Sequence, residues 1–282
     1  MTAGHAPPQT EARRHLQSEA IRRRFEAASD IVDEAAALAM RMRPLPGMAS
    51  ATLKGAQDWL TEADGAVEAL IAGRIMALFP DDDFQGEEGG EQERSGPKSS
   101  LRWVVDPIDG TSNFARGRSR WCVSLGLLAD GMPAAGLLNA PALGECFAAR
   151  IGGGATLNGN PVRAAETSDL RSAMVEVGWG PKVSAADYTA MIGRMMALGV
   201  APRTGGSGAL ALADVACGRL DCYIELSINL WDVVGALPIL AEAGARVSPF
   251  LRDGGITGAI PILAAAPALA EAISKASGLS LA

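Results

Sequence analysis

The residues best suited to chemistry follow the apolar, strand-like run at 101–105. Asp106 and Asp109 come after this run, and Gly110 gives the backbone the freedom that a tight turn needs. Thr111-Ser112 then has the sequence of a helix start, where free backbone N–H groups bind anions. Two carboxylates and an anion can share one turn if a cation bridges them. The sequence therefore predicts a phosphate that is held through a divalent metal ion.

The same turn also has a purely structural interpretation, in which Asp109 caps the helix and Asp106 is solvated. Other acids in the chain favour the chemical interpretation. Asp64 leads into an apolar helical pattern, Glu87-Glu88 stands between glycines, and Asp232 lies at another predicted helix start. If such acids converge they need protons or cations, since two bare carboxylates about 4–5 Å apart repel by roughly 3–4 kcal/mol.

Histidine chemistry is excluded by the positions of the histidines. The chain has two, His5 and His15, and both lie in an N-terminal stretch that we do not expect to pack. This removes Ser-His-Asp and Cys-His catalysis, phosphohistidine chemistry and His-ligated zinc. The chemistry falls to carboxylates, hydroxyls, Lys or Arg, and hard oxygen ligands favour magnesium, manganese or calcium.

Hydrophobic periodicity predicts the elements that must position these acids. The predicted strands cover residues 101–105, 122–128, 134–138, 145–150, 173–177, 201–204, 221–225, 247–250 and 260–265. The predicted helices cover 19–43, a segment through 67–78 that Pro80 ends, 185–198, 209–217, a segment from Trp231 to about Gly244 that contains Pro238, and 267–277.

The connections between these elements carry turn signals. Asp130-Gly131 and Asn158-Gly159 predict tight hairpins. We expect residues 54–64 to form a polar connection and residues 81–83 a solvated turn. The basic run at 22–24 is interpreted as a solvated face of the first helix.

The alternation of strands and helices predicts an α/β fold in layers. We expect a flexible N-terminal tail at 1–18 and an N-terminal α+β half at 19–166 that carries most of the acids. A C-terminal α/β half at 167–282 would carry Asp232 and the substrate pocket.

Composition bounds the class of protein. The chain has 282 residues, of which 48% are hydrophobic and 20% charged, as in globular proteins. The net charge of −7 argues against nucleic acid or an anionic membrane as the main partner. The four cysteines lack Cys-x-x-Cys spacing, and with no signal peptide visible we expect buried free thiols in the cytoplasm. The longest apolar run, near 259–270, contains two prolines and is too short for a membrane helix.

Taken in chain order, the acids form a recognisable pattern. The sequence resembles the signature of the inositol monophosphatase family, the magnesium-dependent, lithium-sensitive phosphatases, through Asp64, Glu87-Glu88, Asp106-Pro107-Ile108-Asp109-Gly110-Thr111 and Trp231-Asp232. The likeness runs from about residue 22 to about residue 265. The resemblance implies a layered αβαβα sandwich, a homodimer, and magnesium, or manganese, as the cofactor.

The resemblance also implies two metal sites that share one carboxylate. Glu87, Asp106 and the Ile108 carbonyl would hold the first metal ion. Asp106, Asp109 and Asp232 would hold the second. Divalent ions are the economical way to keep so many carboxylates together.

Catalysis is assigned by the same resemblance. Asp64 and Glu87 would support a weaker third metal site through water. Thr111 and Asp64 would orient the attacking water, and the phosphate would lie on the backbone N–H groups of Gly110 and Thr111. The catalytic residues predicted in this way are Asp64, Glu87 and Thr111.

The substrate pocket is predicted from family positions too. Glu225 stands seven residues before Asp232, where family members contact sugar or polyol hydroxyls. Gly206 and Ser207 match the loop that lines the same pocket. The chain departs from the family pattern near this site with Ser119, Val234, Ala245 and a cluster of arginines, which bind a second anionic group or pair with surface acids: Arg116, Arg118 and Arg120.

The leading prediction is a magnesium-dependent phosphomonoesterase for a small polyol phosphate such as inositol monophosphate, with no nucleic acid or membrane partner. The alternative within the family is a histidinol-phosphate phosphatase, followed by enzymes acting on fructose 1,6-bisphosphate or nucleotide 3′-phosphates. An aspartyl-phosphate route through Asp106 would want Asp-x-Asp rather than the Asp-x-x-Asp of this chain. A non-catalytic binding protein on the same scaffold is the remaining alternative.

Overall fold

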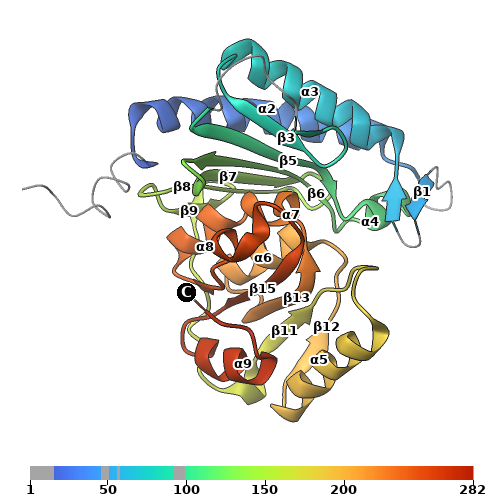
Figure 1. Cartoon of the computed structure of the whole chain (residues 1–282), viewed down its shortest axis with the longest axis vertical. Coiled ribbons are helices and arrows are strands. Elements are labelled where there is room, and N and C mark those ends of the chain that lie inside the picture. The colour runs from blue at the N-terminus through green and yellow to red at the C-terminus, as the bar shows by residue number, and fades with distance from the viewer. Residues whose placement is uncertain (1–15, 46–50, 56–57, 92–98, 282) are drawn as a thin grey trace, which may run out of the picture.

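Five layers of alternating helices and sheets build the molecule (Figure 1). The structure is a computed structural model that describes residues 16–45, 51–55, 58–91 and 99–281. Two long helices form one outer layer, and two helices at the opposite end form the other: α2 (Glu19–Met42) and α3 (Glu62–Leu78), then α5 (Ala185–Ala197) and α9 (Ala270–Ser277). Three shorter helices lie between the two sheets: α6 (Gly208–Ala216), α7 (Leu230–Val234) and α8 (Leu237–Ala243). The predicted αβαβα sandwich is confirmed.

The larger sheet has eight strands in the order β10-β9-β8-β7-β6-β5-β3-β4. Its strands are antiparallel except for the parallel pair β3 and β5. The bounds are β3 (Asp83–Gly86), β4 (Gly90–Glu91), β5 (Leu101–Asp109), β6 (Cys122–Ala129), β7 (Met132–Ala140), β8 (Glu145–Arg150), β9 (Ala155–Leu157) and β10 (Asn160–Pro161). Both predicted hairpins are confirmed, because Asp130, Gly131, Asn158 and Gly159 all have positive φ between paired strands.

The smaller sheet has five strands in the order β12-β11-β13-β15-β14. Strand β11 is parallel to both of its neighbours, and β15 is antiparallel to β13 and β14. The bounds are β11 (Met174–Val177), β12 (Ala201–Arg203), β13 (Cys222–Ile228), β14 (Arg246–Val247) and β15 (Ile260–Ala265), with a short 3₁₀ turn at Leu170–Ser172. The core between the two sheets is filled largely by apolar side chains of α6, α7 and α8.

Four local predictions are wrong for physical reasons. Strand β5 does not stop at 105 but continues through Asp109, because a bulge between Asp106 and Asp109 accommodates Pro107. The connection at 54–64 holds the hairpin β1 (Thr52–Gly55) and β2 (Asp58–Leu60) and the start of α3. Pro238 was expected to kink one continuous helix, and the disruption is greater, because the segment divides into α7 and α8 with Pro238 in the first turn of α8. After β14, the predicted strand gives way to a π-helical turn at Leu251–Gly255.

Burial also corrects the predictions for charged and terminal residues. Asp82 is buried instead of solvated, and Arg24 leaves the solvated face of α2 to pair with it. Leu16, placed in the predicted tail, packs in the core, while residues 1–15 lie outside the described residues.

The four cysteines are free thiols as predicted, but only two are buried. Cys146 and Cys217 are partly exposed, unlike Cys122 and Cys222. Among the described residues, no helix is long and apolar enough to cross a membrane.

Candidate active site

Two aspartates project from the end of β5, where the strand bulges and turns into the short helix α4 (Thr111–Ala115). Asp106 is 1% exposed and its Oδ1 accepts a hydrogen bond of 2.9 Å from the backbone N–H of Ile108. Gly110 makes the turn with a φ of 89°, a left-handed conformation that favours glycine. The bulge and this glycine therefore place Asp106 and Asp109 at one edge of the sheet.

A third aspartate arrives from the C-terminal half at the start of α7. Asp232 belongs to a capping box in which its Oδ2 accepts a hydrogen bond of 2.9 Å from the backbone N–H of Asn229. The helix approaches the large sheet closely, because an added Cβ at Gly136 would overlap the carbonyl oxygen of Gly235. Val234, the residue before Gly235, packs against the same sheet over Gly126, where no larger residue would fit.

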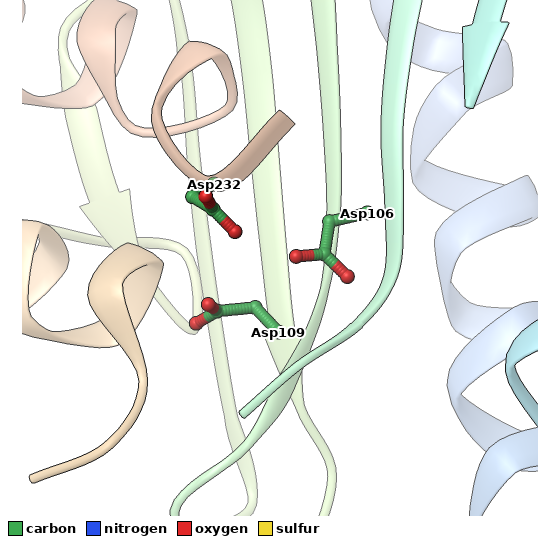
Figure 2. A group of neighbouring side chains, drawn as sticks. All are labelled: Asp106, Asp109 and Asp232. Atoms are coloured by element: carbon green, nitrogen blue, oxygen red, sulfur yellow. The ribbon is translucent and has the colours of Figure 1, made fainter. Parts of the chain in front are cut away.

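The three carboxylates point toward one another (Figure 2). One oxygen from each of Asp106, Asp109 and Asp232 lies within 4.8 Å of the other two. The first two residues are buried and the third is partly exposed. Three converging carboxylates offer the hard oxygen donors that a divalent cation prefers. The residues present therefore fit a metal ion.

The electrostatics of this cluster point the same way. Without a bound cation, burial and repulsion from Glu87, Asp109 and Asp232 raise the pKa of Asp106 well above its ordinary value. Burial and the charge of Asp109 raise the pKa of Asp232 to about 7. Burial and the charge of Asp232 raise the pKa of Glu87 to about 8. A cation that neutralised the cluster would remove this penalty.

Glu87 lies in the turn that follows β3, beside the trio rather than within it. Its Oε1 is 3.4 Å from the Nζ atom of Lys54, which also contacts Glu88 at 2.5 Å. Glu68 holds the turn, because its carboxylate accepts hydrogen bonds from the backbone N–H groups of Glu88 and Gly89 at 2.9 and 2.7 Å. The predicted contribution of Glu87 to a metal site thus depends on a turn that is fixed from α3.

Thr111, Asp64 and Ile108 meet where β5 turns into α4. The Thr111 hydroxyl donates to the Ile108 carbonyl oxygen at 2.9 Å and lies 3.4 Å from Oδ1 of Asp64. Asp64 is fully buried, and its Oδ2 accepts hydrogen bonds from the backbone and hydroxyl of Thr61 at 2.8 and 2.6 Å. Burial raises the pKa of Asp64. This hydroxyl–carboxylate pair has the chemistry needed to orient a water molecule and share its proton.

Asp109 is fixed by the start of α6. The Ser207 hydroxyl donates to its Oδ2, and the backbone N–H groups of Gly208 and Ala209 donate to its carboxylate at 3.2 and 3.0 Å. Burial raises the pKa of Asp109, and these three donors oppose that rise. Ser207, which was predicted to bind substrate, therefore has its hydroxyl engaged with Asp109.

Glu225 lies between two cavities that open beside the cluster. The larger has a volume of about 340 Å³ and the smaller about 180 Å³, and both are lined by Glu225 and Asp232. Gly206 and Ser207 line the smaller one. Glu225 accepts a hydrogen bond from the Tyr223 hydroxyl, and burial raises its pKa to about 7.

The three arginines near the site have separate partners. Arg120 pairs with Asp214 at 2.7 Å and with the buried Glu176 at 3.1 Å. The guanidinium of Arg118 donates to the Asn113 side chain at 2.8 Å, and that of Arg116 lies 5.1 Å from the ring centre of Trp59. Arg120 thus pairs with acids as predicted, although one of these acids is buried and not on the surface.

Two residues that contribute to the site were not predicted from the sequence. Asn113 donates through its amide to the carbonyl oxygens of Arg120, Gly205 and Gly206 at 2.7, 2.9 and 3.2 Å, which ties the two halves together. Trp179 lines the smaller cavity. The position of Asn113 in the first turn of a predicted helix could have pointed to a structural role for this polar residue. The sequence around Trp179 contains no comparable signal.

A family model described as the inositol monophosphatase family matches residues 18–279. The chain belongs to the inositol monophosphatase family. This confirms the resemblance seen in the sequence. The family is metal-dependent, in keeping with the acidic cluster.

Individual members of the inositol monophosphatase family are similar over most of the chain. Inositol monophosphatase 2 of Solanum lycopersicum is 39% identical over 203 residues, which cover 69% of this chain and 76% of the relative. The Nus factor SuhB of Xylella fastidiosa is 35% identical over 199 residues, which cover 70% and 71%. The structure of inositol monophosphatase from Anabaena superposes with a TM-score of 0.77 at 30% identity and covers 90% of this chain and 95% of that one.

Proposed function

We propose that this inositol monophosphatase family member is a magnesium-dependent phosphomonoesterase that hydrolyses a small polyol phosphate such as inositol monophosphate. The observation that carries the proposal is the trio Asp106, Asp109 and Asp232, whose carboxylate oxygens lie within 4.8 Å of one another. Such a cluster is an expensive arrangement without a cation and an effective one with it. The oxygen-only donor set favours magnesium, with manganese as the substitute.

The residues around the trio would divide the work. Bound divalent cations would activate a water molecule and stabilise the leaving oxygen. Asp64 and Thr111 would orient that water and share its proton, since their side chains already lie 3.4 Å apart. Glu87 and the Ile108 carbonyl would complete the cation sites. The backbone N–H groups of Gly110 and Thr111 would bind the phosphate.

The substrate is proposed from the cavities next to the cluster. Glu225 lines both cavities and Gly206 lines the smaller one, which supports contacts between these residues and the hydroxyl groups of a polyol. The names of relatives include inositol monophosphatases, which supports a polyol phosphate. Histidinol phosphate is the alternative, because a carboxylate such as Glu225 also suits an ammonium group. The homodimer, the cytoplasmic location and the lack of a nucleic-acid partner stay predictions.

Phosphate release from a panel of esters tests the proposal. The panel consists of inositol 1-phosphate, histidinol phosphate, fructose 1,6-bisphosphate, a nucleoside 3′-phosphate and p-nitrophenyl phosphate. We expect hydrolysis in magnesium, complete loss in excess EDTA, and recovery when magnesium is restored. Full activity in excess EDTA, or no hydrolysis of any ester in magnesium, would contradict the proposal.

A further inference from the structure

Trp179 is an exposed tryptophan at the wall of the smaller cavity. Its side chain is 42% exposed, whereas Trp103 and Trp121 are 1% and 0% exposed in the core. The same cavity is lined by Asp109 and Asp232 of the acidic cluster. A ligand that covers an exposed indole removes apolar surface from water, which stabilises the complex. Because the cavity adjoins the acidic cluster, the organic part of a bound substrate is the ligand that could contact Trp179.

The segment that carries Trp179, between β11 and α5, is held in place by backbone contacts. The N–H of Gly178 donates to the carbonyl oxygen of Ile224 at 2.8 Å. The indole N–H donates to the carbonyl oxygen of Val183 at 3.3 Å. Because this polar edge is already bonded within the segment, the side chain offers a ligand mainly its apolar ring.

Close packing sets this segment against the polyol end of the pocket. An added Cβ at Gly178 would overlap both Glu225 and Tyr223. The residue before Trp179 therefore touches the carboxylate that is proposed to bind hydroxyl groups. Glu225 and Trp179 line the same small cavity. A hydrogen-bonding carboxylate beside an apolar ring suits a ligand with polar groups on its rim and an apolar face.

We propose that Trp179 is a specificity-determining residue whose indole packs against the ring of a cyclic alcohol phosphate. The inference rests on the proposed phosphatase function and narrows it to cyclic substrates. A carbocyclic polyol presents C–H groups and a heteroaromatic alcohol presents a flat ring, and both faces pack on an indole. An acyclic polyol phosphate lacks such a face and gains little there.

Steady-state kinetics of Trp179→Ala, with Trp179→Phe as the matched control, test this role. We expect the alanine variant to raise KM about tenfold for inositol 1-phosphate, histidinol phosphate or both, with kcat within about twofold. For the acyclic ester glycerol 2-phosphate, both constants should stay within about twofold. The phenylalanine variant keeps an aromatic face and should stay within about threefold of wild type. Equal losses on cyclic and acyclic esters, or no change in KM, would overturn the proposal.

A binding measurement separates this inference from the phosphatase function. The indole N–H resonance of Trp179 is assigned by its loss in Trp179→Phe. In the presence of magnesium and inorganic phosphate, this resonance should shift when myo-inositol or histidinol is added. The alcohol that causes the shift identifies which ring packs against Trp179. Glycerol at the same concentration should leave the resonance in place. If no ester is hydrolysed, the phosphatase function fails, and a ring-specific shift still supports the role of Trp179. No shift with either ring alcohol overturns that role.

Discussion

The buried Asp82 has a cationic partner, whereas the buried Asp106 and Asp109 have acidic neighbours. Asp82, at the start of the large sheet, accepts two hydrogen bonds of 2.7 Å from the Arg24 guanidinium and one of 2.8 Å from the indole N–H of Trp103. Asp106 and Asp109 instead face each other and a third carboxylate, and the partners that fix them are neutral N–H and O–H groups. The guanidinium balances the charge of the buried Asp82 carboxylate, whereas the charges of the three converging carboxylates are balanced only if a cation binds.

The largest expected effect lies in the converging group. Asp109→Asn keeps the shape of the side chain but removes one negative charge from the proposed metal site. We expect phosphatase activity to fall by at least about 100-fold. The melting temperature in EDTA should be equal to or above that of wild type, because the substitution relieves repulsion. Near wild-type turnover would mean that Asp109 only fixes the start of α6.

The matching change in the paired group should affect stability and not chemistry. Arg24→Met leaves Asp82 buried without its cation, and we expect the free energy of unfolding to fall by about 2–3 kcal/mol. Urea unfolding followed by circular dichroism measures this loss, and the activity of the folded protein should stay within about twofold. Arg24→Lys keeps the charge and should lose less. If Arg24→Met instead lost activity without losing stability, the contrast between the two groups would be wrong.

Glu225 also has a neutral partner, the Tyr223 hydroxyl, but it is not one of the three carboxylates that converge. Glu225→Gln should lower kcat/KM about tenfold for polyol phosphates and leave p-nitrophenyl phosphate nearly unchanged, since the aryl ester makes no hydroxyl contact. A larger loss on histidinol phosphate would indicate a broken charge pair with its ammonium group. Equal losses on all three esters would show that Glu225 does not touch the organic part of the substrate.

The smallest expected effect is a pH dependence of the metal-free protein. Burial and repulsion raise the pKa of Glu87 to about 8 and that of Asp232 to about 7. Between pH 4.5 and 8 the folded state therefore holds more protons on these groups than the unfolded state, and stability falls as pH rises. In EDTA we expect the melting temperature to drop by about 3 °C from pH 5.5 to 8.5.

Two controls connect that drop to the acidic cluster. Magnesium should raise the melting temperature more at pH 8.5 than at pH 5.5, because it binds the deprotonated carboxylates. Asp109→Asn should show a smaller drop in EDTA. A melting temperature that rises with pH in EDTA would contradict the assignment.

The sequence predicted the elements that local patterns specify. The first helix was expected at 19–43 and is found at Glu19–Met42, because its apolar spacing buries one face. The turns at 130–131 and 158–159 were specified by their own residues. The acids of the site were found because a motif marks them, although their individual roles stay predictions.

The features that the sequence did not reveal depend on residues far apart in the chain. Asp82 was placed in solvent because its partner Arg24 lies 58 positions away. The bulge in β5 depends on pairing with β6, so the two aspartates appeared to end the strand. Trp179 was missed because its neighbours in the cavity come from several segments.

The contact between Gly136 and Gly235 has a consequence for how tightly the two halves of the site are set. Backbone meets backbone at this point, so no side chain separates Gly136 of the large sheet from Gly235 at the end of the helix that carries Asp232. A displacement of either partner passes to the other without being absorbed by a rotamer. The contact between these two backbones therefore helps to set the distance of Asp232 from Asp106 and Asp109. A single methyl group at Gly136 would overlap the Gly235 carbonyl oxygen and push the helix that carries Asp232 away from the large sheet.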